Sequence, residues 1–79
     1  MKNLDEIIEN IEFGLYLDDD LLEITYNILE DAENYNDFEL EMAWRIENDY
    51  DGRLAWILSK NSYKDVDEFC KDIKKYLED

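Results

Sequence analysis

Apolar and polar residues alternate without a break through the middle of this 79-residue chain. Every second position from 38 to 46 is apolar, which is the period-two pattern of a half-buried strand. The apolar positions are Phe38, Leu40, Met42, Trp44 and Ile46. After Asp51-Gly52, a dipeptide typical of hairpin turns, apolar residues again fall on one side. The pattern predicts an antiparallel β-hairpin over about residues 38–47 and 53–60, whose tryptophan-bearing face packs on helices.

A helical interpretation of the same stretch stays open. Phe38, Met42 and Ile46 also recur at i, i+4 and i+8, and this stretch is rich in residues that favour helices. The alternative fold is therefore a small all-α bundle. The alternation favours the hairpin, because a helix would turn Leu40 and Trp44 away from the Phe38 stripe.

The sequence up to about residue 37 predicts two helices. Asn3 followed by Glu6 resembles a capping box, and helical spacing of apolar residues follows to about Phe13, with Gly14 as a left-handed stop. The triplet Asp18-Asp19-Asp20 offers N-caps for a second helix that fades at residues 34–37. The apolar face of this helix consists of Leu21, Ile24, Thr25, Ile28, Leu29 and Ala32.

The C-terminal stretch predicts one further helix. Ser62 followed by Asp65 is the expected cap, and an apolar stripe with helical spacing follows it. The stripe consists of Val66, Phe69, Cys70, Ile73 and Leu77. The fold expected for the single domain of residues 1–79 is therefore α+β, with two N-terminal helices, the hairpin and a C-terminal helix.

The amino-acid composition limits the kinds of catalytic and binding site that the chain can form. The chain has no histidine, which excludes imidazole bases and Ser-His or Cys-His couples, and no phosphate-binding loop is present. A non-enzymatic protein without a cofactor is expected. The single Cys70 fits a reducing cytoplasm and a buried thiol. No apolar run is long enough for a membrane span or a signal peptide, so a cytoplasmic location is expected.

Negative charge dominates one half of the chain. The formal net charge is −15, and residues 1–51 carry all of it, with 17 acidic residues against two basic ones. Residues 52–79 carry six of each. Such a field repels phosphate backbones and anionic membranes, so a basic protein partner is expected, with neither direct nucleic-acid binding nor membrane binding.

One segment partly matches a calcium-binding loop. Residues 47–54 place acids at loop positions 1, 3 and 5 and glycine at position 6. Position 12, where a bidentate glutamate belongs, is Leu58. The Asp-Gly pair is explained by the hairpin turn, so no metal site is expected.

The hairpin would arrange acids in a row. Glu39, Glu41 and Glu47 would lie on its solvent side at intervals of roughly 6.7 Å per two residues, about two nucleotides of axial rise along one DNA strand. We expect the partner-binding residues to be this row, the hairpin tip and the acidic triplet, namely Glu39, Glu41, Glu47, Asp49, Tyr50, Asp51, Asp18, Asp19 and Asp20. The simpler alternative is a merely solvated acidic surface.

In size, acidity, lack of histidine and the expected mix of helices with a hairpin, the chain resembles the small DNA-mimic inhibitors of bacteriophages and mobile elements, such as anti-CRISPR and antirestriction proteins. Three stretches carry the resemblance: the acidic triplet, residues 30–33 and the series from Glu39 to Asp51. The resemblance implies stoichiometric inhibition, in the host cytoplasm for a phage protein, with the acidic face occupying the channel of a DNA- or RNA-binding effector. The alternative function is an immunity or adaptor protein that binds one basic partner.

Overall fold

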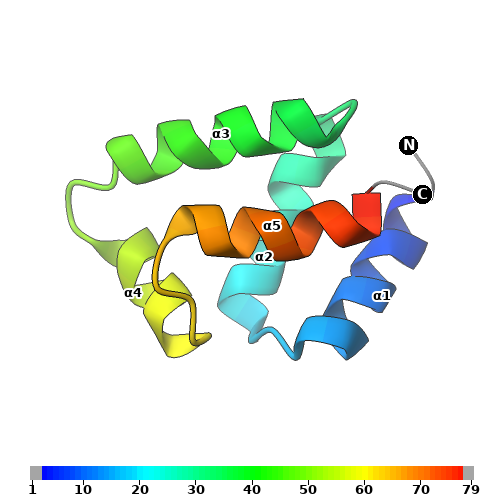
Figure 1. Ribbon diagram of the computed structural model, residues 1–79, viewed down its shortest axis with the longest axis horizontal. Helices are drawn as coiled ribbons and strands as arrows, with labels where there is room; N and C mark the ends of the chain where they lie inside the picture. Colours follow the sequence, from blue (N-terminus) through cyan, green and yellow to red (C-terminus); the bar gives the residue numbers. More distant parts are fainter. Residues whose placement is uncertain (1–2, 78–79) are drawn as a thin grey trace.

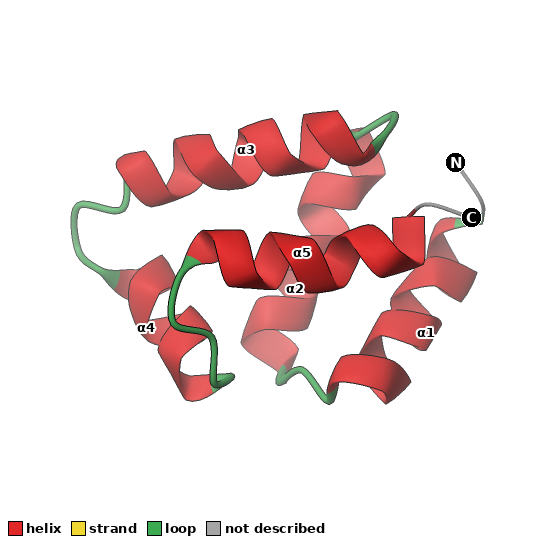
Figure 2. Cartoon of the chain, viewed as in Figure 1, coloured by secondary structure: helices red, strands yellow, loops and turns green. Residues whose placement is uncertain are grey.

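The computed structural model describes residues 3–77, which form five helices and no strand (Figures 1 and 2). The helices are α1 (Leu4–Leu15), α2 (Asp19–Asp31), α3 (Tyr35–Glu47), α4 (Arg53–Lys60) and α5 (Val66–Leu77). Helix α5 packs against α1 and α3, while α2 contacts α1, α3 and α4. In Figure 1, α5 crosses in front of α2, α3 forms the upper edge, and α1 and α4 lie on opposite sides. None of these helices is both long and apolar enough to cross a bilayer.

The predicted hairpin is wrong, and the all-α alternative is confirmed. Residues 38–47 belong to α3, and residues 53–60 form α4. Phe38 and Met42, one turn apart, are fully buried, whereas Leu40 and Trp44 are 68% and 60% exposed. The alternating apolar residues therefore divide between two opposite sides of a helix, because residues two positions apart point in nearly opposite directions around its axis.

The turn glycine has a different role from the predicted one. Gly52 has a left-handed conformation, with a φ of 73°, but it is the N-cap of α4 and not part of a hairpin turn. Trp56 of this helix, predicted to pack inside the fold, is 57% exposed, and the Lys60 ammonium lies 4.3 Å from its ring centroid. Neither tryptophan is a core residue.

The three helices predicted outside the hairpin are confirmed, with corrected ends. The Asn3 side chain caps α1 by accepting the Glu6 N–H, as expected. Gly14 does not stop this helix, which ends with Tyr16 in the left-handed conformation. At the start of α5, the side chain of Asp65 accepts the Glu68 N–H, so Asp65 takes the capping role that was predicted for Ser62.

All five helices contribute to the core, and part of it is an aromatic cluster that joins α3, α5 and the loop before α5. The ring of Phe69 lies 6.2 Å from that of Phe38 and 5.0 Å from that of Tyr63, centroid to centroid. The Tyr63 hydroxyl donates to Asp72 at 2.8 Å, and its burial raises the pKa of this phenol. Cys70 is buried beside this cluster, as expected for a structural thiol. Helix α3 also contacts α2 and α4, and the side of α3 that carries Leu40 and Trp44 faces solvent.

Candidate protein-binding surface

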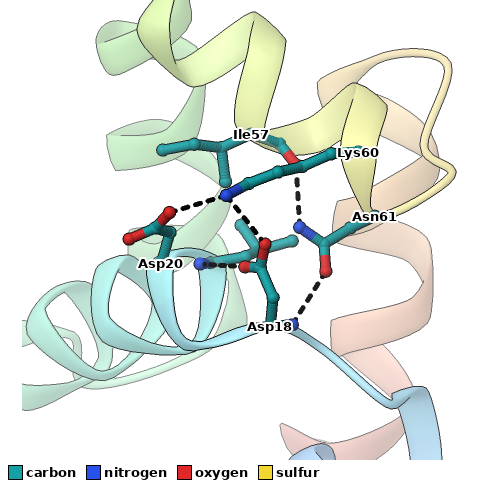
Figure 3. A network of polar contacts seen from close by, with 6 residues as sticks. Asp18, Asp20, Ile57, Lys60 and Asn61 are labelled. Carbon is teal, nitrogen blue, oxygen red and sulfur yellow. Dashed lines mark hydrogen bonds and ion pairs between the residues drawn. The ribbon is translucent and has the colours of Figure 1, made fainter.

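Asp18 holds the start of α2 against the end of α4 (Figure 3). One carboxylate oxygen accepts the Leu21 N–H at 2.9 Å, and the other lies 3.0 Å from the Lys60 ammonium. The Asp18 N–H donates to the Asn61 side-chain oxygen at 2.9 Å, and the Asn61 amide donates to the Ile57 carbonyl at 2.8 Å. This carboxylate, predicted to bind a partner, is thus engaged within the fold.

The other two residues of the acidic triplet differ in their roles: Asp20 forms an ion pair within the fold, and Asp19 is exposed to solvent. Asp20 also accepts from the Lys60 ammonium, at 2.6 Å, while Asp19 is exposed and makes no hydrogen bond or ion pair within residues 3–77. The hydrogen bond from Leu21 holds the pKa of Asp18 below its ordinary value of 3.8. The hydrogen bonds to Asp20 and Asp18 raise the pKa of Lys60. Of the triplet, only Asp19 has a carboxylate free for a partner.

The acids of the α3–α4 loop cap α4. The two oxygens of Asp49 accept the N–H groups of Leu54 and Ala55, each at 2.9 Å, and Asp51 accepts the Arg53 N–H at 3.0 Å. They satisfy backbone donors that a helix N-terminus leaves without intrahelical partners. Within residues 3–77, no group of three or more Cys, Asp or Glu side chains is placed to hold a metal ion.

The predicted acidic row is wrong, because it required a strand. On helix α3, residues 39 and 41 lie about 200° apart around the axis. Glu39 accepts the Tyr35 hydroxyl at 2.9 Å, Glu41 pairs with Arg45 at 3.0 Å, and Glu47 is exposed. These three carboxylates therefore do not form the row that was predicted for a strand.

The structure instead brings together two adjoining hollows along α2 and α3, which we call the α2–α3 trough. Its aromatic half, about 510 Å³, is bordered by Trp44 and Tyr50 and lies over Ile24, Leu54 and Ile57. Its acidic half, about 220 Å³, is bordered by Asp31, Asp37 and Glu41. Arg45 borders both halves, so they adjoin at this residue along one side of α3.

Sequence reasoning missed most of this trough. It placed Trp44 in the core and did not include Asp31 or Asp37 among the partner-binding residues. Of the predicted partner-binding residues, the trough includes Glu41, Asp49, Tyr50 and Asp51. A signal was present in the helical alternative, where Leu40 and Trp44, spaced i and i+4, fall opposite the buried Phe38–Met42 pair.

Exposed acidic residues are distributed over α1, α2 and α3. Arg45 is the only basic residue within these three helices, whereas α4 and α5 hold five. The exposed acids of α1–α3 that form no ion pair within the described part of the chain are Asp5, Glu6, Glu9, Glu12, Asp19, Glu23, Glu30, Asp31, Asp37, Glu39 and Glu47. The negative charge of the N-terminal part of the sequence is thus carried by α1, α2 and α3, whereas most of the basic residues lie in α4 and α5.

Comparisons with protein-family models, curated proteins and solved structures find no match for this chain. The observations that bear on its function are the trough and the acidic surface of α1–α3.

Proposed function

We propose that this protein is a non-catalytic cytoplasmic inhibitor that binds a basic, nucleic-acid-handling protein and blocks its DNA- or RNA-binding surface. The proposed targets are of the anti-CRISPR or antirestriction kind, namely a CRISPR effector or a restriction enzyme. Inhibition is stoichiometric: the acidic surface occupies the place of the nucleic acid and nothing is turned over.

The observation that carries the proposal is the unpaired acidic surface of α1–α3. Eleven exposed carboxylates there form no ion pair within residues 3–77. Their mutual repulsion opposes folding, and a basic partner would relieve it. A surface that binds DNA carries opposite charge and attracts acidic ligands over long range, so the same steering favours this protein.

The proposal includes no reaction. The chain has no histidine, and both halves of the trough are open to solvent. General acid–base catalysis by carboxyl groups needs an environment that shifts their pKa values apart, usually by burial. An acidic surface in open solvent suits binding better than proton transfer.

A second candidate is an immunity or adaptor protein that binds one basic partner without imitating nucleic acid. It is favoured by the exposed aromatic side chains of the trough, since Tyr50 is 91% and Trp44 60% exposed. Such residues serve contact with a defined protein surface rather than imitation of a phosphate backbone. The two candidates share the basic partner and differ in whether nucleic acid is displaced.

The experiment is a competition assay with purified basic effectors. A guide-loaded Cas9-type nuclease and a type I restriction endonuclease are each saturated with fluorescent duplex DNA, and this protein is titrated in. The proposed inhibitor displaces the DNA, and its apparent affinity falls steeply as salt is raised. If protein and DNA stay bound together, blocking is wrong and the adaptor function is favoured. If neither effector binds even at about 50 mM salt, where electrostatic attraction is strong, this target class is wrong.

A further inference from the structure

The α2–α3 trough separates two kinds of chemistry along one side of α3. On α3 the acidic half is lined by Asp37, Glu41 and Arg45, whereas the aromatic half is lined by Trp44 and Arg45. Asp37 and Trp44 are seven residues apart, which corresponds to about 10 Å along the helix axis, or about two helical turns. A ligand that fills both halves must carry two different groups at that separation.

The acidic half is suited to a cation. Three carboxylates border it, and Arg45 is the one basic group among its lining residues. Arg45 already pairs with Glu41, and one Asp37 oxygen accepts the Glu33 N–H at 3.0 Å, while Asp31 is exposed. The half therefore keeps a net negative charge with carboxylate oxygens left to accept hydrogen bonds from a lysine or arginine.

The aromatic half is suited to an apolar side chain. Its charged lining residues are Arg45, which pairs with Glu41, and Arg53, Asp49 and Asp51, and both aspartates are engaged in accepting backbone N–H groups of α4. Its floor consists of the aliphatic residues Ile24, Leu54 and Ile57. The exposed rings of Trp44 and Tyr50 stand at its border, and Leu40 continues this apolar surface one turn before Trp44.

The negative charge of the acidic half limits which molecules can bind in the trough. A second copy would bring another net charge of −15 against the acidic half, and nucleic acid or an anionic membrane would be repelled in the same way. The chain's own basic helix α5 cannot occupy the trough, because its apolar residues Phe69 and Ile73 are fully buried in the core. Of the ligands considered, a positively charged segment of another protein is the one that suits the trough.

We propose that the α2–α3 trough binds a basic amphipathic segment of the partner, with a lysine or arginine in the acidic half and an apolar side chain beside Trp44 and Tyr50. The inference rests on the proposed function in one respect, the basic partner, and it specifies where that partner is held. Trp44 is the central contact residue, and the remaining acids of α1–α3 supply long-range attraction.

The first test uses the effector that binds in the competition assay. Trp44→Gln lowers its affinity at least about thirtyfold, as expected for a central aromatic contact, and Trp56→Gln, a similarly exposed tryptophan outside the trough, changes it less than about threefold. The double variant Asp37→Asn/Glu41→Gln loses more affinity than Glu9→Gln/Glu12→Gln, which removes the same charge from α1. Equal losses within each pair would overturn the trough while leaving the acidic inhibitor in place.

The second test does not depend on any effector. The probe is a helical peptide of about 14 residues that carries lysines and leucines about seven residues apart on one face. The control peptide has the same composition with the two groups on opposite faces. Binding is followed by Trp44 fluorescence in a Trp56→Phe background. The trough binds the first peptide at least about tenfold more tightly than the control, and Asp37→Asn/Glu41→Gln removes the difference. Equal affinity for both peptides would overturn the inference even if an effector is inhibited.

Discussion

Asp18 and Asp19 are neighbours of the same charge, and the structure predicts opposite consequences of removing them. Asp18→Ala removes the N-cap of α2, which costs about 1 kcal/mol of stability, while the exposed ion pair with Lys60 adds little. For a domain of this size that loss lowers the melting temperature by about 4–8 °C. Asp19→Ala removes an equal charge but no hydrogen bond, and it changes the melting temperature little, because the fall in self-repulsion offsets the lost attraction to the N-terminus of α2.

The dependence on pH gives this prediction a second check. The pKa of Asp18 is lower in the folded protein than its ordinary value of 3.8, because the carboxylate accepts the Leu21 N–H. Its contribution to stability is therefore fully present above about pH 4 and is lost as pH falls through the lowered folded pKa. Thermal unfolding followed by circular dichroism should show wild type and Asp18→Ala converging in acid. Equal melting temperatures of the two alanine variants at neutral pH would refute the capping network.

Three further predictions follow from the same contacts. Asp49→Ala removes the acceptor of two N–H groups at the start of α4 and lowers the free energy of unfolding by about 1–2 kcal/mol in a urea titration; no change would contradict its capping role. A Cβ at position 14 would overlap the Tyr76 hydroxyl, so Gly14→Ala destabilises the protein despite alanine's higher helix propensity, and Tyr76→Phe recovers part of the loss; an additive double-mutant cycle would contradict this. Burial raises the pKa of the Cys70 thiol to about 12, so a thiol reagent at neutral pH reacts with it only as fast as the protein opens, whereas rapid reaction would contradict its burial.

The helices outside the middle of the chain could be predicted because several signals agreed there. Asn3 and Asp18 are caps in the sequence and in the structure, and an apolar stripe of helical spacing follows each of them. The prediction for residues 38–46 was wrong because their alternation of apolar and polar residues matches the period of a strand better than that of a helix. The core uses Phe38 and Met42, while Leu40 and Trp44 are left in solvent, where packing does not explain their apolar character. The expectation that large apolar residues are buried in the core therefore fails at Leu40 and Trp44, which belong to the surface that we assign to partner binding.

The site was less predictable than the fold, because its parts come from distant segments. Nothing local to residue 18 reveals that Lys60, 42 positions later, will pair with its carboxylate. Likewise, Asp31 reaches the trough only because α2 packs beside α3. The sequence does contain the charge asymmetry, but which acids remain free for a partner depends on the caps and ion pairs of the folded chain.

The central claim, that a basic partner is held in the α2–α3 trough, is tested most directly by amide hydrogen exchange. Exchange is compared between the free protein and its complex with the effector that it displaces from DNA. The account predicts slower exchange in residues 24–31 of α2 and 37–50 of α3 and the following loop, with α5 unchanged. Protection confined to α1, or to α4 and α5, would contradict it.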